Sequence, residues 1–349
     1  MKTIKFKYLL LLLIVPGITF AEGIKGKYTK EKKINRAFSV SNNAGLDVYN
    51  KYGNVYVTTW DQDRTEIDVV IKVSGNNEDK VNRRLNTINV AFESTKSMVI
   101  AKTLIENFSA NNISMEINYT IKIPKQGSLK LSNSYGSTVL GEINGKADIT
   151  CKYGSLKLEA LNSNSNSVNL KYCDSNKLGF INQGTVDAGY SDVTLTRSNN
   201  LKLQSDYSNI KIGEVGDIMV RSDYGDVSIL KGGVIAGTGR YLNFKFGSVS
   251  ELLNITADYG NVNVSSIKKS LKNVAITASY TNIDLNYEAG FNFDFEVTLR
   301  YSDLSGSNLN FSTKNEKNTS AYYKGNNGKS GQARVYVKSE YGNVTLEQL

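Results

Sequence analysis

The sequence has 349 residues and a formal net charge of +9, and it contains no histidine. The absence of histidine removes the commonest general base and the commonest metal ligand, which disfavours most hydrolytic and metal-dependent chemistry. Residues 127–349 hold 23 Lys/Arg against 21 Asp/Glu. This large part of the chain is therefore nearly neutral, which argues against a nucleic-acid partner.

The first 21 residues have the pattern of a secretory signal peptide. Lys2, Lys5 and Lys7 precede an apolar core of 7 residues, Leu9 to Val15, and small residues follow up to Ala21. The core is too short to span a bilayer, and no later segment is apolar enough to do so. We therefore expect cleavage near Ala21, export to the periplasm or cell surface, and no transmembrane segment in the mature chain.

Residues 22–126 predict an N-terminal β section that caps the rest of the fold. Alternating segments near 65–73, 88–93, 97–103 and 113–123 indicate strands. One short helix is expected near 77–86, because an Asx residue starts a segment with apolar Val81 and Leu85. At the start of this section, the lysines at 25, 27, 30, 32 and 33 suggest a solvated basic tail or a contact with anionic head groups.

A short phrase recurs through residues 127–349: tyrosine, a small residue, Asn, Asp or Ser, then an apolar residue. Between Tyr153 and Tyr224 its copies are 17 to 19 residues apart, and later spacings reach 21. A degenerate copy begins at Tyr172, and Phe246-Gly-Ser-Val reads as a copy with Phe in place of Tyr. The copies that match begin at Tyr52, Tyr135, Tyr153, Tyr190, Tyr207, Tyr224, Tyr259, Tyr280, Tyr301 and Tyr341.

Each repeat has the pattern of strand, corner, strand. Apolar residues alternate before the tyrosine, as at Leu201 and Leu203, and again after it, as at Ile210 and Ile212. A unit of this size cannot bury enough apolar surface alone, so stacked neighbours are needed. The sequence predicts an all-β fold: a single elongated parallel β-solenoid with rungs of about 17–21 residues and a thicker N-terminal section.

The tyrosines at 135, 153, 190, 207, 224, 259, 280, 301 and 341 are predicted to form a structural ladder at the corners. Their parity with the aliphatic positions four and six residues earlier predicts that the rings are substantially buried. Residues 313–333, rich in Asn, Lys, Gly and Ser, are expected to be an inserted loop. The chain ends on a full repeat, 335–346, so we expect that loop to cover the last rung, or two chains to associate end to end.

The order of these motifs resembles a known family. The sequence Asn-Lys-Tyr-Gly-Asn-Val-Tyr-Val at 50–57, with Trp60-Asp61, precedes an alternating strand, a short charged helix and Asn118 to Pro124; Tyr-Gly repeats follow. This resembles the bacterial β-strand-repeat family called "putative adhesin", common in Bacteroidetes-type genomes and without known function. The resemblance covers nearly all of the mature chain and implies a repetitive β fold. It implies no catalytic residues.

Two further residue sets invite a chemical interpretation. Asp206, Asp223 and Asp226 form a candidate acidic cluster for glycoside hydrolysis, and Asp223 with Asp226 is a candidate for incidental divalent binding, but turn chemistry explains aspartate at these corners. Cys151 and Cys173 are expected to be free, because their columns differ by three residues and have opposite parity. We therefore assign no catalytic, cofactor-binding or metal-binding residue.

Three functions fit this sequence. The first is a non-enzymatic, adhesin-like binding module of the cell envelope, for a glycan, an envelope polymer or another protein. The second is a carboxylate-dependent glycan-active enzyme on a β-helix. The third is a structural or envelope-stress accessory protein without a ligand of its own. An acidic cluster in an open cleft favours the second function, and exposed rows of aromatic residues favour the first.

Overall fold

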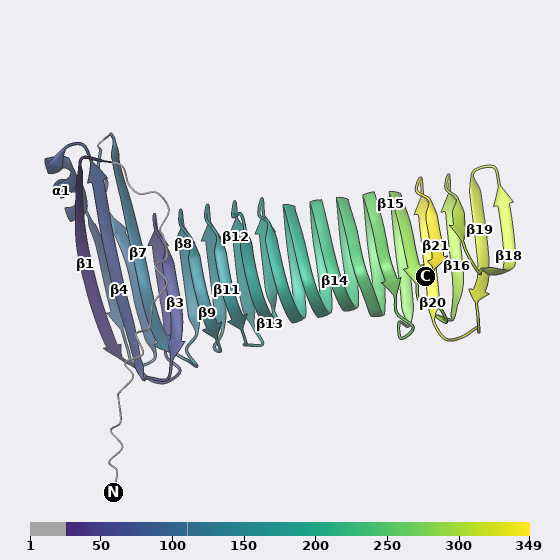
Figure 1. The fold of residues 1–349 in the computed structure, drawn as a ribbon, viewed down its shortest axis with the longest axis horizontal. Helices are drawn as coiled ribbons and strands as arrows, with labels where there is room; N and C mark the ends of the chain where they lie inside the picture. The colour runs from purple at the N-terminus through teal and green to yellow at the C-terminus, as the bar shows by residue number, and fades with distance from the viewer. Residues whose placement is uncertain (1–25, 110) are drawn as a thin grey trace, which may run out of the picture.

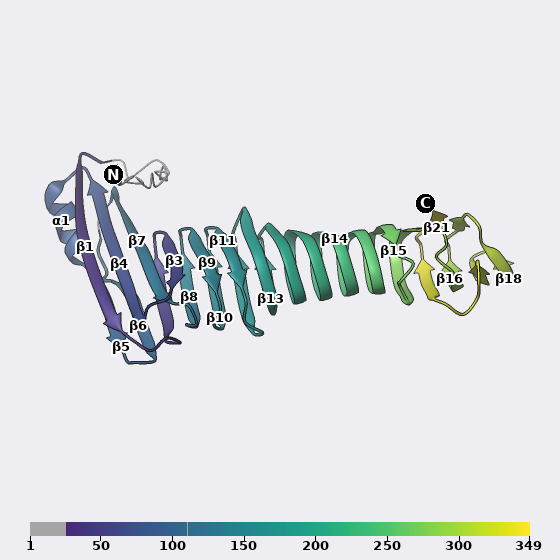
Figure 2. The ribbon, with the colours of Figure 1, turned by 60° about the horizontal axis from the view of Figure 1, so that its bottom comes forward.

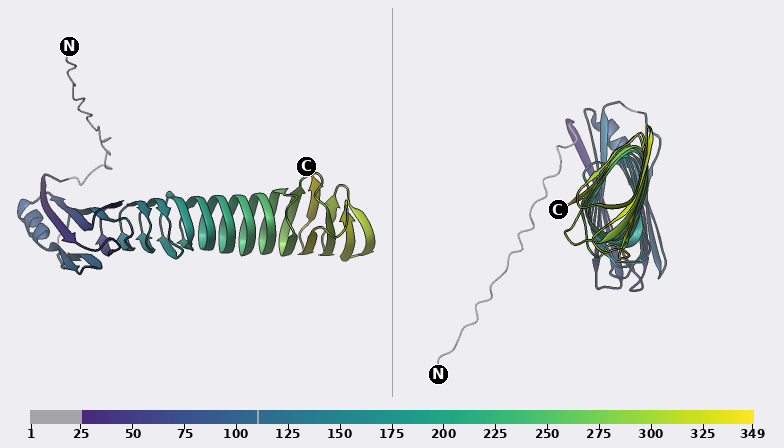
Figure 3. Two further views of the ribbon diagram at one scale, coloured as in Figure 1. Left: turned by 90° about the horizontal axis from the view of Figure 1, so that it is seen from below. Right: turned by 90° about the vertical axis from the view of Figure 1, so that its right-hand side faces the viewer.

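A computed structural model describes residues 26–109 and 111–349; the predicted signal peptide lies outside these ranges. The fold is all-β with one helix in the described residues, as the sequence predicts for its class. Figure 1 shows an elongated body in which a broad sheet at the N-terminal end continues into a stack of narrow rungs. Seen end-on in Figure 3, the rungs superpose as a flattened loop around the core.

The N-terminal sheet is mainly antiparallel. β4 (Arg64–Gly75) pairs on one side with β1 (Tyr28–Ser39) and on the other with β7 (Ile113–Pro124). The helix α1 (Glu78–Asn86) follows β4, and the Asn77 side chain caps it by accepting from the Lys80 amide. β5 (Ile88–Ser94) and β6 (Met98–Ile105) form an antiparallel hairpin.

The predicted basic tail is wrong where the structure describes it. Lys30, Lys32 and Lys33 lie within β1, which pairs with β4 along its whole length. The Lys30 ammonium contacts the Glu78 carboxylate at 2.6 Å. The sequence hid this strand because Lys30 and Lys32 lie on the same face as Ile34 and Phe38, and that face packs only partly against the core.

Parallel pairing joins this sheet to the rungs. β2 (Gly45–Lys51) pairs in parallel with β6 and with β8 (Leu129–Ser134), while β3 (Val55–Trp60) pairs with β7 and with β9 (Thr138–Ile143). Later rungs add to this stack in parallel register (Figure 2): β10 (Ala147–Lys152), β11 (Leu156–Leu161), β12 (Asn166–Lys171), β13 (Asn176–Gly189), the winding β14 (Val193–Ile267) and β15 (Asn273–Tyr287).

One continuous apolar core runs inside the stack. In register, Val186 pairs with Leu203 and Ile255 with Ile276, and all four side chains are buried. Because the strands are parallel and stacked in register, each buried side chain lies above its equivalent in the next rung. The alternation seen in the sequence is therefore the alternation between this core and solvent.

The last repeat of the sequence is not the last rung in space. β20 (Arg334–Glu340) lies between β15 and β16 (Phe293–Arg300), in parallel with both. β21 (Val344–Gln348) lies likewise between β15 and β17 (Leu304–Gly306). The chain therefore returns to fill an interior rung, and the prediction of an open terminal rung at 335–346 is wrong.

The predicted loop at 313–333 is also wrong for most of its length. β18 (Asn310–Lys317) and β19 (Ser320–Asn327) form an antiparallel hairpin, and β19 pairs antiparallel with β16. The hairpin covers β16 rather than the 335–346 repeat, as the far end of Figure 1 shows. Polar composition suggested a loop, but a short edge hairpin can be polar because only alternate residues of β19, Ala321, Tyr323, Gly325 and Asn327, turn to the core.

Candidate functional site

Twelve tyrosines form one continuous stack along the corner of the rungs. Successive ring centroids are 4.6 to 5.1 Å apart and the rings are within 15° of parallel. We call this set the tyrosine ladder; in spatial order it consists of Tyr52, Tyr135, Tyr153, Tyr172, Tyr190, Tyr207, Tyr224, Tyr241, Tyr259, Tyr280, Tyr341 and Tyr301.

The prediction that these rings are buried is wrong. Eleven of the twelve have between 41% and 51% of their surface exposed, and only Tyr52 is more covered. The physical reason lies in the backbone: every ladder tyrosine has a positive φ, from 49° to 64°. This left-handed conformation reverses the direction of the side chain, so parity with the preceding strand no longer predicts where the ring points.

Left-handed backbone is costly for an aromatic residue, at about 1–2 kcal/mol each. Glycine or asparagine would adopt it more cheaply. Stacking offsets part of the cost, because an aromatic pair contributes about 0.5–1.5 kcal/mol and the stack has about one pair per ring. A residue kept in a strained and exposed position at every rung points to a role for its side chain.

Sequence reasoning missed one rung of the ladder. Tyr241 occupies the corner that the repeat phrase assigned to Phe246, and Phe246 is buried in the core. The phrase required a small residue after the tyrosine, and Leu242 stands there instead. The spacing of 17 residues from Tyr224 was the available signal.

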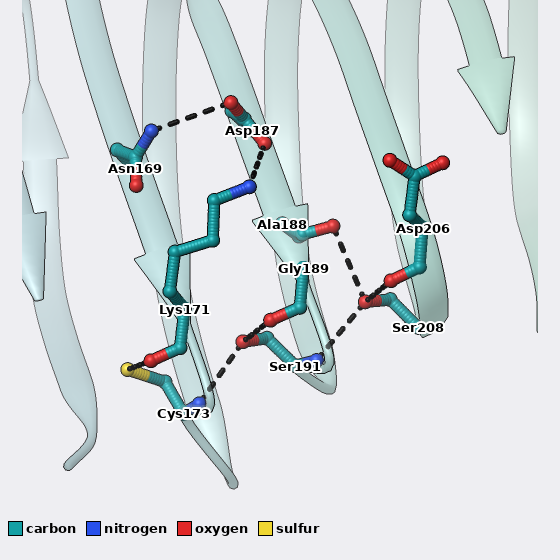
Figure 4. A network of polar contacts seen from close by, with 9 residues as sticks. All are labelled: Asn169, Lys171, Cys173, Asp187, Ala188, Gly189, Ser191, Asp206 and Ser208. Carbon is teal, nitrogen blue, oxygen red and sulfur yellow. Dashed lines mark hydrogen bonds and ion pairs between the residues drawn. The ribbon is translucent and has the colours of Figure 1, made fainter. Parts of the chain in front are cut away.

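Beneath the ladder, the residues that follow three successive tyrosines, Cys173, Ser191 and Ser208, are buried and tie neighbouring rungs together (Figure 4). The Ser191 hydroxyl accepts from the Cys173 amide and donates to the Gly189 carbonyl, and the Ser208 hydroxyl accepts from the Ser191 amide. These hydroxyls satisfy buried backbone groups that the sharp corner removes from the strand ladder. The serine that follows the tyrosine in these repeats therefore satisfies backbone hydrogen-bonding groups on the inner side of the corner.

The candidate acidic residues lie beside this corner, but the structure does not bring their carboxylates into one cleft. Asp223 lines a hollow of about 370 Å³, and Asp226 lines another of about 590 Å³. Arg240 binds Asp223 at 2.8 Å, and Lys245 binds Asp226 at 3.1 Å. Hydrogen bonding from Arg240 lowers the pKa of Asp223. Asp206 is exposed, and its carbonyl accepts from Ser208.

A column of residues, most of them charged, runs along one side of the ladder. It consists of the residue before each tyrosine, on the outer face of the strand that enters the corner, and we call it the flanking column. The Lys51 ammonium lies 4.9 Å from the Tyr52 ring centroid and 5.7 Å from that of Tyr135, and the Arg300 guanidinium carbon lies 5.4 Å from that of Tyr301. The column and the ladder therefore form one surface.

The charges in the flanking column are segregated along the axis. Pairing registers and stacking give its order as Lys51, Ser134, Lys152, Lys171, Gly189, Asp206, Asp223, Arg240, Asp258, Ser279, Glu340 and Arg300. The end nearest the N-terminal sheet is basic. Beyond Gly189 the column becomes mainly acidic.

The two cysteines are both free and both buried. The Cys173 thiol donates to the Cys151 carbonyl at 3.2 Å. Burial raises the pKa of the Cys151 thiol to about 12, which keeps it protonated and unreactive at neutral pH. In residues 26–109 and 111–349 we find no group of three or more Cys, Asp or Glu side chains that could hold a metal ion. Over the same ranges, the helix is not one that could cross a bilayer.

Comparison with solved structures finds similar chains of low identity. One is the putative adhesin BF0245 of Bacteroides fragilis, with 13% identity over 91% of this chain and 97% of that chain and a TM-score of 0.26. A putative adhesin of Parabacteroides merdae shows 11% identity over 93% and 99%, with a TM-score of 0.27. A putative lipid binding protein of Parabacteroides distasonis shows 10% identity over 90% and 96%, with a TM-score of 0.35. At such TM-scores the likeness carries no argument about function.

No curated protein matches the sequence. A family model does match, over residues 44–347, which takes in β3, the rungs and the whole tyrosine ladder with its flanking column. This match covers most of the chain and agrees with the family resemblance of the repeat phrase. The chain belongs to the Toastrack DUF4097 family.

Proposed function

We propose that this protein is a non-enzymatic, exported, adhesin-like module of the cell envelope that binds its partner through the tyrosine ladder. The observation that carries the proposal is the ladder itself: eleven half-exposed aromatic side chains in one unbroken row. Tyrosine is enriched at binding surfaces because its ring is apolar and its hydroxyl tolerates water. The parallel-solenoid architecture supports the same function, since it repeats one binding element at every rung.

The geometry of the ladder limits the kind of partner. Each interior ring has a neighbour about 5 Å away on both faces, so a sugar ring cannot lie flat on it. What the ladder offers to a partner is ring edges and hydroxyl groups. Partial desolvation, with neighbouring phenols adding to it, raises the pKa of Tyr207, so its hydroxyl remains a donor at neutral pH. These features favour an extended polymer or a protein surface over an isolated sugar.

The glycan-active enzyme is less well supported. Hydrolysis of a glycosidic bond needs one carboxylic acid with a raised pKa beside an ionised carboxylate. Arg240 instead lowers the pKa of Asp223, and Lys245 neutralises Asp226. Their separation into two hollows gives no shared space for a scissile bond.

The test compares two triple variants in binding to purified cell envelopes and to a glycan array. In the first, Tyr190, Tyr207 and Tyr224 become Asn, which tolerates the left-handed backbone. In the control, three exposed apolar residues outside the ladder, Met219, Leu230 and Phe311, become Asn. We expect the first variant to lose binding and the control to keep it. Equal binding by both variants, or turnover of a glycan by the wild type, overturns the proposal; no binding by the wild type favours the accessory role.

A further inference from the structure

Resting on the proposed function, we infer that the partner of the tyrosine ladder is a second copy of this chain, lying antiparallel with ladder against ladder. The inference comes from the charge pattern of the flanking column. One antiparallel register, which pairs Arg240 with Glu340, is self-complementary over six rungs, and the longest self-complementary register spans nine. In that register Gly189 lies opposite Gly189 of the second copy. The basic end of each chain then faces the acidic part of the other.

The contacts in this register follow from the order of the column. Counting outward from Gly189, Lys171 of one chain lies opposite Asp206 of the other. The next rungs oppose Lys152 to Asp223 and Ser134 to Arg240, and the last opposes Lys51 to Asp258. The two-fold axis repeats every contact, so all charged pairs within the flanking column are of opposite sign. On the other side of the ladder, the exposed Asp192 lies opposite Asp192 of the second copy at the axis.

Neighbouring registers lack this property. A shift of one rung in one direction places Lys152 opposite Arg240, and a shift in the other direction places Lys51 opposite Arg240. In a parallel two-fold arrangement the two flanking columns lie on opposite sides of the paired ladders and do not meet. Like-charge contacts disfavour the registers shifted by one rung.

The central groups lie where such contacts need them. Lys51, Lys152 and Asp206 are exposed, and Asp258 is half-buried beside the ladder. Lys171 and Asp223 already hold partners within the chain, Asp187 and Arg240, each at 2.8 Å. Across the interface, Asp206 of the second copy adds to the Lys171–Asp187 pair, and Lys152 of the second copy adds to the Asp223–Arg240 pair. Asp223, Arg240 and Asp258 share the hollow of about 370 Å³, which gives opposing side chains room to enter.

The size of the surface is sufficient for a stable dimer. Nine rungs, from Tyr52 to Tyr259, overlap in the proposed register. At about 4.8 Å per rung and a width of about 20 Å, the strip buries about 800 Å² on each copy, as in a standard protein interface. The tyrosines supply the apolar middle of this strip, and the flanking column supplies its charged rim.

The experiment uses the full chain and two complementary charge reversals. The first variant carries Lys51→Glu and Lys152→Glu, and the second carries Asp223→Lys and Asp258→Lys. Alone, each variant replaces four attractive contacts with repulsive ones. Mixed in equal amounts, they restore every attraction, because the carboxylates introduced in the first variant then face the ammonium groups introduced in the second.

Sedimentation over a concentration series measures the dissociation constant. We expect a wild-type dimer that weakens with salt, a rise of about a hundredfold for each variant alone, and recovery to within about tenfold in the mixture. Recovery in the mixture also shows that both variants are folded. A matched control, Lys157→Glu with Lys177→Glu on the strand that leaves the corner, should leave the dimer unchanged.

A wild-type chain that stays monomeric at high concentration overturns the inference, as does a mixture that associates no better than its components. If envelope binding nevertheless depends on the ladder tyrosines, the proposed function stands and only the self-pairing fails. If neither is observed, both fail.

Discussion

Tyr341 stacks on Tyr280 with ring centroids 4.7 Å apart, and its other face stacks on Tyr301 at 4.8 Å. Tyr341 therefore lies between Tyr280 and Tyr301 in space, although it follows both of them in the sequence. The amide of Asn343 binds the Asn282 side chain, and the Asn343 side chain binds the Asp303 amide. The C-terminal repeat is thus held on both sides like any interior rung.

This placement makes Val337 a core residue although it lies close to the end of the chain. Its side chain is fully buried, between Ile276 of β15 and Val297 of β16. We expect Val337→Asp to lower the free energy of unfolding by about 3 kcal/mol or more, because it buries an unpaired charge. Urea unfolding measures the effect, and the exposed neighbour change Lys338→Asp should cost about 0.5 kcal/mol or less. A cost below about 1 kcal/mol for Val337→Asp would mean that the last repeat is a frayed terminal rung.

The balance between strain and stacking in the ladder can be measured at Tyr207. Its ring centroid is 4.9 Å from that of Tyr190 and 4.6 Å from that of Tyr224. We expect Tyr207→Phe to be nearly neutral, and Tyr207→Asn to cost about 1 kcal/mol because lost stacking outweighs relieved strain. Tyr207→Val should cost about 2 kcal/mol or more, since a β-branched residue at positive φ loses stacking and keeps the strain. An asparagine variant more stable than the wild type would show that stacking does not offset the backbone cost.

The sequence was sufficient for the regular parts of this fold and for the strand-to-core alternation. Period-two patterning located Leu201, Leu203, Ile210 and Ile212 inside, and all four are buried. It could not locate the tyrosine rings, because a single left-handed residue reverses side-chain direction without changing the pattern of the letters. The ladder's place on the surface therefore depends on a dihedral angle that no periodicity reports.

The predicted order of the last rungs was wrong for a different reason. The repeat phrase at Tyr341 is as regular as the one at Tyr301, and regularity alone says that both are rungs without saying which comes first. Sequential stacking is the default, because neighbouring elements usually pair. Here the hairpin of β18 and β19 pairs with β16, and β20 then enters between β15 and β16.

The inward hydroxyl of Ser191 predicts a local cost at the corner. We expect Ser191→Ala to lower the free energy of unfolding by about 1–3 kcal/mol, because the buried Cys173 amide loses its acceptor. Ser228→Ala, at a position that faces outward on a nearby strand, serves as the control and should change stability by about 0.5 kcal/mol or less. Amide hydrogen exchange at Cys173 provides a second readout: its protection should fall in the Ser191 variant and persist in the control. Unchanged protection would show that another group satisfies the Cys173 amide.

The last prediction concerns pH. Burial raises the pKa of the Tyr119 phenol, which is fully buried with its oxygen 2.7 Å from that of Thr103. Burial, with Glu316 adding to it, raises the pKa of Tyr323 to about 12. Because these folded-state pKa values lie above the ordinary tyrosine value of about 10, their contribution to stability is complete below pH 10 and is lost as pH rises through the folded values. We therefore expect the urea concentration at the midpoint of unfolding to decrease as the pH is raised above 10.

At acid pH the expected change is smaller. Hydrogen bonding from Arg240 lowers the pKa of Asp223, and hydrogen bonding from Lys268 lowers that of Glu288. Their contribution is present above the ordinary carboxyl range and is lost as pH falls below about 4. Both pairs are partly exposed to solvent and screened by it, so each contributes little. The variant Tyr119→Phe separates the alkaline loss of stability from the acid loss. It should reduce the loss of stability above pH 10 and leave the loss at acid pH unchanged. The control variant Tyr336→Phe, whose ring faces outward, should change neither. If Tyr119→Phe keeps the full alkaline loss, the buried phenol is not its source.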